Sequence, residues 1–331
     1  MQKCAQFCGT KNIIHMKAIV LKQYGGPDVL ELQDAAMPGP AADEVLVKVQ
    51  AVNVNYADVL VRRGIYPAGA PLPAIAPGEV EGVVEKAGAA VTHLRPGQRV
   101  TGFAPAGYAE YAVLKAAQAI CLPAGLPLGH GLLGHALTAQ NLLHQAEGCQ
   151  SVVITAAAGG VGSMAVQLAV LKGVKNIIGL VGSREKVARV KALGATHAIS
   201  YEEADWQQQV RAATGNTGAD LVLDAVGGAI GGALVGLLAP KGTLVVYGSS
   251  SGQPTLVTAQ ELIFTGARVT GATLFTAPPE KLQQWAGEVI QYMEAGRLQL
   301  QVTPYPLADA AVAQEAVEGR KTMGKVVLVP A

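Results

Sequence analysis

The chain has 331 residues, of which 50% are hydrophobic and 15% are charged, and its formal net charge at pH 7 is +1. A chain of this length and apolar content can bury a large core and is long enough for two domains, which excludes an intrinsically disordered protein. The near-neutral charge argues against binding to nucleic acid or to an anionic membrane. No apolar run reaches the roughly 18 residues that a membrane-spanning helix needs.

The N-terminal residues lack the apolar segment of a secretory signal, and a natural first strand starts only at Met16. We therefore expect residues 1–15 to be a disordered leader. The chain has four irregularly spaced cysteines: Cys4, Cys8, Cys121 and Cys149. This spacing does not form a disulfide framework, and reduced cysteines lead us to expect a cytoplasmic protein.

The first third of the chain predicts a mainly β domain. Between Met16 and about Gln118, short apolar runs alternate with turns that contain Gly and Pro. The expected strands include Val45–Val54, Val80–Glu85, Arg99–Phe103 and Tyr108–Leu114. A helical pattern then covers Leu126–Glu147.

The middle of the chain alternates strands with helices. The expected strands are Val152–Thr155, Asn176–Gly182, His197–Ser200, Asp220–Asp224, Thr243–Gly248 and Arg268–Thr273. This alternation predicts a parallel, doubly wound sheet. The remaining tail, with an amphipathic helix at Glu280–Ala295 and a last strand at Lys325–Val329, is more similar to the first domain. We therefore expect the tail to return to that domain.

The stretch Ser151–Gly162 predicts a dinucleotide site, because a buried strand leads through a turn of Ala and Gly into a helix expected over Val161–Lys172. Small side chains let a ligand approach the backbone, and the N–H groups at a helix N-terminus attract a pyrophosphate. The first position of the G-x-G-x-x-G fingerprint is Ala157, and Gly159 and Gly162 occupy the other two. The strand–turn–helix context favours a cofactor site over a glycine-rich turn that only packs closely.

The end of the second strand of this unit favours NADPH over NADH. An NAD site has an acidic residue there to bind the ribose, but this chain has Gly182. Ser183 can donate a hydrogen bond to a phosphate, and Arg184 and Lys186 can supply positive charge. The alternative is an ordinary solvated start of the next helix.

Several motifs together resemble the zinc-free medium-chain dehydrogenase/reductases of the quinone oxidoreductase (zeta-crystallin-like) group. They are Ala51–Asp58, Pro77–Gly82, Ala156–Gly162, Leu193–Ala195, Asp224–Gly228 and Gly324–Val329. The resemblance extends from Met16 to the C-terminus and implies an α/β protein in which a GroES-like, mainly β catalytic domain (16–138 and 275–331) is split around a Rossmann NADPH-binding domain (139–274). It also implies a homodimer, or a tetramer, paired through the sheet edge at Arg268–Thr273.

The resemblance also implies roles for individual residues. Asn55 would lie beside the nicotinamide and orient it or the substrate carbonyl, and Tyr66 would lie in the substrate cleft; a loop-capping Asn and a structural Tyr are the alternatives. The implied cofactor contacts are Thr138 near the nicotinamide, Gly159, Gly160, Val161 and Gly162 at the pyrophosphate, Ser183, Lys186, Tyr201 and Arg320 at the 2′-phosphate, and Val226, Gly248, Ser249 and Phe275 along the groove.

A metal site is not expected. Zinc-dependent relatives place a Cys where this chain has Asn55, a His where it has Gly78, and a third ligand near Gly134. An amide and glycines cannot replace thiolate and imidazole ligands. His130, His135 and His144 cluster in the sequence, but no Cys or carboxylate completes a ligand set, and we interpret them as core or surface histidines.

The predicted function is zinc-independent, NADPH-dependent hydride transfer to a quinone, in which the protein mainly positions the reactants. The first alternative is reduction of an α,β-unsaturated carbonyl, such as an alkenal or an enoyl thioester, with Tyr56 or Tyr66 as the candidate proton donor. The second alternative is an NADPH-binding protein without catalysis. The short loop Phe103–Tyr108 predicts an open substrate site, which leaves the substrate class undecided.

Overall fold

The computed structural model describes residues 14–66, 71–145 and 148–331. Cys4, Cys8 and most of the expected leader lie outside these residues. The first strand, β1 (His15–Leu21), starts one residue before the expected position. The leader prediction was therefore wrong at its C-terminal end: His15 belongs to β1, and the carbonyl of Ile14 accepts a hydrogen bond from Met37 N at 2.9 Å.

A six-stranded parallel sheet forms the core of one half of the molecule. Its strands are β9 (Ser151–Ile154), β10 (Asn176–Val181), β11 (His197–Ser200), β12 (Ala219–Asp224), β13 (Leu238–Val246) and β14 (Arg268–Gly271). Their spatial order is β11-β10-β9-β12-β13-β14, which confirms the doubly wound sheet. The strand order reverses between β9 and β12, and ligands bind at such a switch point, beyond the carboxyl ends of the strands.

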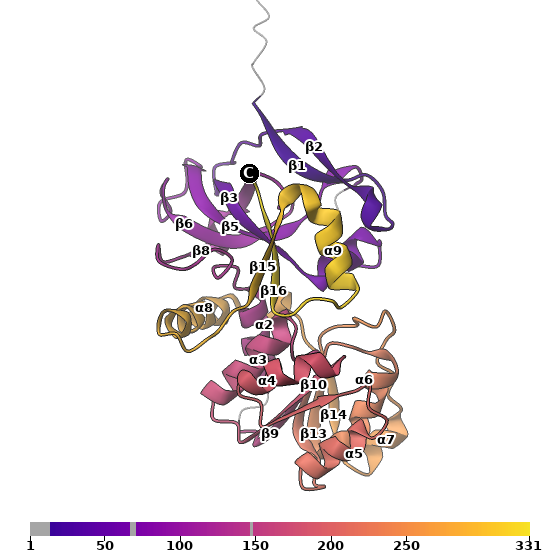
Figure 1. Cartoon of the computed structure of the whole chain (residues 1–331). Coiled ribbons are helices and arrows are strands. Elements are labelled where there is room, and N and C mark those ends of the chain that lie inside the picture. Colours follow the sequence, from indigo (N-terminus) through magenta and orange to yellow (C-terminus); the bar gives the residue numbers. More distant parts are fainter. Residues whose placement is uncertain (1–13, 67–70, 146–147) are drawn as a thin grey trace, which may run out of the picture.

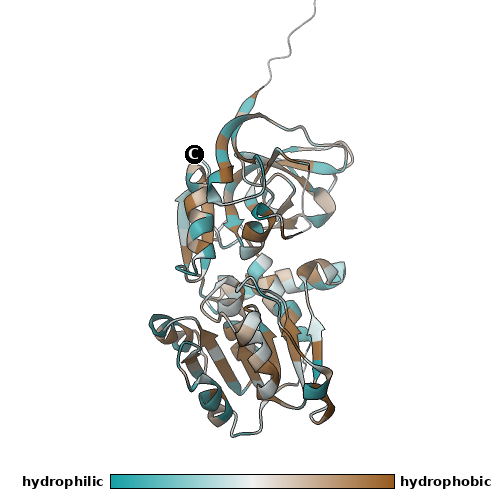
Figure 2. Ribbon diagram, turned by 90° about the vertical axis from the view of Figure 1, so that its right-hand side faces the viewer, coloured by the Kyte–Doolittle hydropathy of each residue, from teal (hydrophilic) through white to brown (hydrophobic). Residues whose placement is uncertain are grey.

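Helices cover both faces of this sheet. They are α2 (Gly134–His144), α3 (Gly160–Leu171), α4 (Val187–Ala192), α5 (Trp206–Ala213), α6 (Gly228–Leu234) and α7 (Ala259–Ile263). Successive β9 side chains point to opposite faces: Val152 and Ile154 belong to the core cluster with α2 and α3, whereas Val153 packs in the cluster with α5. Figure 2 shows apolar residues concentrated in the strands between the helices.

Helix α2 is shorter than the helical pattern at Leu126–Glu147 predicts, since it begins only at Gly134. The preceding residues form turns, in which Gly129 has a φ of +79°. That left-handed conformation interrupts a helix. The expected N-terminal third of this helix was therefore wrong.

A three-stranded sheet and a seven-stranded sheet form the other half of the molecule. One has the order β2-β1-β4, and the other has the order β15-β16-β3-β5-β6-β8 with β7 on β3. Their further strands are β2 (Leu30–Ala36), β3 (Glu44–Val54), β4 (Ala74–Ile75), β5 (Gly78–Ala87), β6 (Arg99–Ala104), β7 (Tyr111–Lys115), β8 (Ile120–Cys121), β15 (Val302–Pro306) and β16 (Lys325–Val329).

The C-terminal tail returns to the half that contains the N-terminal strands, as its pattern predicts. Strand β16 pairs antiparallel with β3, and Val327 lies opposite Asn53. Figure 1 shows β15 and β16 entering the upper body, above the parallel sheet, with the C-terminus beside them. One half thus has a parallel, doubly wound sheet and the other has mainly antiparallel sheets. This arrangement confirms the expected GroES-like and Rossmann-like fold class.

Three more helices complete the described fold: α1 (Tyr56–Arg62), α8 (Pro279–Glu294) and α9 (Ala310–Glu318). The buried Arg62 and its neighbour Arg63 both form ion pairs with Glu318, and these pairs join α1 to α9. Asn55, just before α1, and Arg320, just after α9, are therefore held by one packed unit. No helix of the described ranges has the length and apolar character needed to cross a bilayer.

Candidate active site

The turn between β9 and α3 leaves backbone N–H groups free to bind a ligand. Gly159 caps α3 with an extended backbone and makes no side-chain capping bond. A Cβ on Gly162 would lie 2.3 Å from the carbonyl oxygen of Ala156, so the turn has no room for a side chain there. Ala156 has a φ of +48°, and Ala157 N donates to Leu180 O at 3.0 Å, so the turn closes tightly without a glycine at the first fingerprint position.

Beyond β10, two cations lie next to each other. Lys186 Nζ donates to the carbonyl oxygen of Arg320 at 2.7 Å, and the Arg320 guanidinium donates to Ser250 O at 2.9 Å. Burial and then the charge of Arg320 lower the pKa of Lys186. Within the described residues neither cation forms an ion pair with a carboxylate. Adjacent unpaired cations of this kind are suited to a phosphate dianion.

Ser183 and Tyr201 flank these cations. Gly182 is the first residue after β10, and Ser183 is the second. A Cβ on Gly182 would lie 2.8 Å from the Tyr201 hydroxyl oxygen. Arg184 differs from the two cations, because its Nε donates to Glu203 Oε1 at 3.0 Å and its side chain is 80% exposed. The expected 2′-phosphate residues are thus brought together, but the charge of Arg184 is already paired.

The expected groove residues follow the carboxyl ends of β12 and β13. Asp224 Oδ1 accepts a hydrogen bond from Val226 N at 2.8 Å, which fixes the loop after β12. Gly248 and Ser249 follow β13, and Ser249 Oγ donates to Gln253 O at 2.8 Å. These loops therefore lie at the carboxyl ends of two neighbouring strands, where the resemblance implies a cofactor groove.

Two aromatic rings from distant segments of the chain also pack together near these loops. Phe275, 78% exposed, packs edge to face on Phe103 of β6, with ring centroids 6.0 Å apart. Thr138, on α2, donates its hydroxyl to Gly134 O at 2.7 Å. The exposed ring faces of the pair offer apolar surface to a planar ligand.

Asn55 lies in a network of hydrogen bonds at the other end of the groove. Its Oδ1 atom accepts from Asn53 Nδ2 at 3.0 Å and is 2.7 Å from His135 Nε2. Asn53 Nδ2 also donates to Glu79 Oε2 at 2.9 Å, and Glu79 Oε1 accepts from Gly134 N, at the start of α2, at 2.6 Å. We call Glu79, Asn53, Asn55 and His135 the Asn55 network.

The Asn55 backbone is fixed as well. Its N–H donates to Asp58 Oδ2 at 2.8 Å, and the Tyr108 hydroxyl donates to the same oxygen at 3.0 Å. Burial raises the pKa of Asp58 to about 7. Asn55 is therefore both a cap of α1, as the alternative reading predicts, and a member of the polar network.

The two candidate tyrosines differ in their hydroxyl contacts. The Tyr56 hydroxyl donates to Ser250 O at 2.9 Å, across the interface of the two halves. Tyr66 is 43% exposed and forms no side-chain hydrogen bond with any described residue. Only Tyr66 therefore has a hydroxyl proton that is not already donated to the protein.

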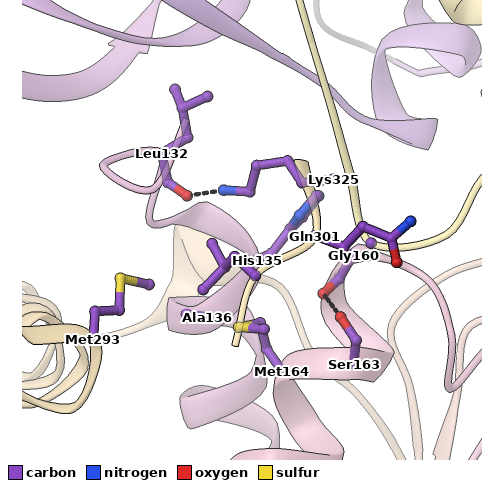
Figure 3. A pocket seen from close by; sticks show the side chains of 11 residues that line it. Leu132, His135, Ala136, Gly160, Ser163, Met164, Met293, Gln301 and Lys325 are labelled. Atoms are coloured by element: carbon purple, nitrogen blue, oxygen red, sulfur yellow. Dashed lines mark hydrogen bonds between the residues drawn. The ribbon is translucent and has the colours of Figure 1, made fainter. Parts of the chain in front are cut away.

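Lys325 adds a buried charge behind the network. Its ammonium donates to Leu132 O. Burial lowers the pKa of Lys325, although the negative charges of Glu79 and Glu81 act to raise it. Figure 3 shows Lys325 and His135 close to Gly160, beside a cavity of about 10 Å³. This end of the groove is thus a packed polar interior, whereas the phosphate end is a surface.

Four residues of the site were missed by the sequence interpretation: Asn53, Glu79, His135 and Lys325. A signal for two of them was present, because Asn53 is fully buried between Val52 and Val54 and Lys325 begins an otherwise apolar strand. A polar residue inside an apolar strand needs a partner. His135, which we expected to be a core or surface histidine, instead contacts Asn55.

The position that carries a histidine ligand in zinc-dependent relatives has no space for a side chain. A Cβ on Gly78 would lie 2.8 Å from Val52 Cγ1 and 2.9 Å from Tyr108 Cε1. Across residues 14–66, 71–145 and 148–331, no group of three or more His, Cys, Asp or Glu side chains is arranged to hold a metal ion. Zinc would require four such ligands, or three and a water.

The fold and this groove define a nucleotide-dependent oxidoreductase of the medium-chain type, and comparisons with known proteins agree. The model of the alcohol dehydrogenase GroES-like domain matches residues 41–149, and that of the zinc-binding dehydrogenases matches residues 160–292. A quinone oxidoreductase of Pseudomonas aeruginosa is 35% identical over 325 residues, which cover 95% of this chain and 99% of that protein. A 2-haloacrylate reductase of Burkholderia is 32% identical, over 95% of this chain and 98% of that protein.

Solved structures give the same result. The quinone oxidoreductase of Escherichia coli, complexed with NADPH, superposes with a TM-score of 0.87 at 30% identity, over 95% of this chain and all of that one. A mycobacterial protein complexed with NADPH gives a TM-score of 0.89 at 34% identity, with the same coverage. The chain therefore belongs to the zinc-free quinone oxidoreductase family of medium-chain dehydrogenase/reductases, which confirms the resemblance seen in its motifs.

Proposed function

We propose that this protein is an NADPH-dependent oxidoreductase that transfers hydride to a quinone without zinc. The observation that carries the proposal is the unpaired cation pair of Lys186 and Arg320 at one end of a groove whose other end presents Asn55. The relatives named quinone oxidoreductases, and the NADPH complex among them, support the same assignment.

The residues present fit NADPH, because the glycine turn has no side chains in the way and the cation pair matches a 2′-phosphate. In this proposal residues 139–274 bind the cofactor and residues 16–138 with 275–331 form the catalytic domain. The residues proposed to contact NADPH are Asn55, Thr138, Gly159, Gly160, Val161, Gly162, Ser183, Arg184, Lys186, Tyr201, Val226, Gly248, Ser249, Phe275 and Arg320.

When bound, NADPH supplies a hydride, which brings two electrons and one proton to the quinone, and a second proton from water completes the hydroquinone. The chain's own task is to position the two rings and to exclude water between them. Asn55 orients the reacting groups through its amide. The pair Phe103 and Phe275, with Tyr66, offers ring surface to a planar substrate.

Reduction of an α,β-unsaturated carbonyl is the second candidate. That reaction needs a proton at the α-carbon after hydride addition at the β-carbon, and Tyr66 has a free hydroxyl for this purpose. The relative named 2-haloacrylate reductase supports this candidate.

Steady-state NADPH oxidation by chelator-treated protein tests these candidates. An ortho-quinone, an alkenal and an enoyl thioester are compared as acceptors, NADH is the cofactor control, and Asn55→Ala is the site control. We expect turnover with NADPH and the quinone that is insensitive to chelation and strongly reduced in the variant. Turnover with only the alkenal or thioester would establish the second candidate, and loss of turnover after chelation would contradict the zinc-free proposal. Tight NADPH binding without turnover of any acceptor would instead indicate a binding protein.

We also propose a cytoplasmic homodimer that pairs through the edge strand β14. All four residues of β14 are exposed, and the adjacent Phe264 is 93% exposed. An exposed edge strand has unpaired backbone N–H and C=O groups, which pairing with a second copy would satisfy. Light scattering should give a dimer for the native chain and a monomer for Val269→Lys; a native monomer would contradict the proposal. The free thiols of Cys121 and Cys149 support a reducing compartment.

A further inference from the structure

We propose that His135 is a positioning residue that, together with Asn53, holds the Asn55 amide with its oxygen toward the protein and its N–H donors toward the cleft. Asn55 then acts as a hydrogen-bond donor to the carbonyl oxygen of the hydride acceptor. This inference rests on the proposed function, because it assigns a direction to the amide that contacts the reacting groups.

The direction of each amide in the Asn55 network follows from Glu79. A carboxylate can only accept hydrogen bonds, so Asn53 must direct Nδ2 toward Glu79 Oε2, 2.9 Å away. The same Nδ2 atom lies 3.0 Å from Asn55, which must therefore present its oxygen. An amide oxygen can only accept hydrogen bonds, so His135 Nε2, at 2.7 Å, must be a donor.

His135 can donate without carrying a charge. It is half-buried, and its removal from water together with the nearby ammonium of Lys325, on β16, lowers its pKa to about 3. The ring is thus neutral at physiological pH, with its proton on Nε2. A neutral donor holds Asn55 without introducing a second charge beside the buried Lys325.

The donor atom of Asn55 is the one that the protein leaves free. Asn55 Nδ2 forms no hydrogen bond with any described residue, and it is not one of the buried atoms that lack a partner. It is therefore exposed to solvent and can be reached by a ligand. When hydride enters a quinone ring, negative charge develops on a quinone oxygen before water protonates it, and a pre-positioned N–H donor stabilises that charge.

His135 also connects the amide to the cofactor turn. Its ring packs so tightly on Gly160, the first residue of α3, that a Cβ there would lie 2.2 Å from His135 Cε1. Figure 3 shows His135 beside Gly160. The imidazole therefore sets the spacing between the turn that we assign to the pyrophosphate and the amide that we assign to the acceptor.

The test compares His135→Gln, which retains an N–H donor, with His135→Leu, which does not; His93→Leu, at an exposed histidine, is the control. We expect kcat to fall about tenfold in His135→Leu and to stay within about threefold of the native value in His135→Gln, because one hydrogen bond in the transition state is lost or kept. The Kd for NADPH, from fluorescence titration, should change by less than about threefold in both variants. Equal kcat in the native, Gln and Leu proteins, or equal loss in both variants, would overturn the proposal.

A second variant tests the donor directly and stays informative if His135→Leu does not fold. Asn55→Asp keeps the shape and the inward acceptor but has no N–H to offer, so kcat should fall at least about tenfold with little change in the Kd for NADPH. Native kcat in this variant would overturn the donor role. If the native protein does not oxidise NADPH with any quinone, the proposed function fails; if it does and these variants are active, only the present inference fails.

Nitrogen-15 spectra of the histidines in the cofactor-free protein give a readout that does not depend on turnover. The signal that is present in the native spectrum and absent from that of His135→Gln belongs to His135. It should show a ring that is protonated at Nε2 and does not change from pH 5 to pH 8. Two charged groups lie near this ring: Lys325 on β16, and Glu79, which is connected to it through Asn53 and Asn55. Titration near pH 6.5, or a proton on Nδ1, would overturn the assignment.

Discussion

The two ends of the groove are built from different kinds of side chain. At the phosphate end, long side chains from separate segments meet. Lys186 donates to the backbone carbonyl of Arg320, and Arg320 donates to that of Ser250. At the Asn55 end, short polar side chains are packed between strands and helices, and each hydrogen bond determines the next. An end built from charged side chains can select a ligand by its charge, whereas an end built from buried amides can select an orientation.

This difference predicts how substitutions act. Changes at the phosphate end should alter affinity and cofactor preference and leave the fold intact. Changes at the packed end should alter turnover or stability, because a neighbouring group is left without a partner. The following substitutions test that contrast.

The largest effect is expected at the turn between the two ends. In Gly162→Val the Cβ atom would collide with backbone, 2.3 Å from Ala156 O. Affinity for NADPH should fall at least about a hundredfold, and the free energy of unfolding by about 1–3 kcal/mol. Titration calorimetry and urea denaturation measure the two quantities. Gly287→Ala, at an open position of α8, is the control and should be neutral or slightly stabilising.

Arg320→Ala should lower affinity for NADPH about tenfold to a hundredfold, because a charge-assisted hydrogen bond to the phosphate is lost. NADH, which has no 2′-phosphate, should bind as it does to the native protein. Kd values for both cofactors at two salt concentrations provide the measurement, and the loss for NADPH should shrink at high salt. An equal loss for both cofactors would place Arg320 elsewhere in the groove.

At the packed end, Asp58→Asn should change the pH dependence of stability. The pKa of Asp58 is about 7 in the folded protein, whereas the ordinary value for an aspartate is 3.8. Between these pH values the folded state therefore binds more protons than the unfolded state. Its contribution to stability is therefore present at low pH and lost as the pH rises from about 4 to 7, by at most about 1.4 kcal/mol per pH unit. Urea denaturation at pH 4, 5.5 and 7 should show a weaker decline in the variant; an unchanged decline would mean that Asp58 is ionised throughout.

The smallest effect is expected for Arg184→Ala. Its guanidinium is exposed and already paired with Glu203, so only a weak, screened attraction to a phosphate is lost. The Kd for NADPH should rise by less than about threefold. A loss as large as that of Arg320→Ala would show that Arg184 leaves Glu203 when the cofactor binds.

Much of the fold could be read from local pattern. Strands β11 and β16 have the predicted bounds, and the other strands of the parallel sheet begin within one residue of prediction except β13, which starts at Leu238 instead of Thr243. Apolar blocks between glycines determine such elements locally. The helix predicted at the position of α2 was too long, because the apolar spacing continues N-terminal to Gly134. The left-handed backbone of Gly129 forms a turn there instead.

For the site, the sequence by itself determined the glycine turn, the missing acidic residue at Gly182 and the motif that contains Asn55, since each is a matter of neighbours along the chain. Only the tertiary structure decided that His135, on α2, would donate to Asn55, and that Arg184 would pair with Glu203 while Lys186 would not. The physical reason is that a hydrogen bond is formed over about 3 Å. Strand register and helix packing determine which distant residues come that close, and residue spacing along the chain does not.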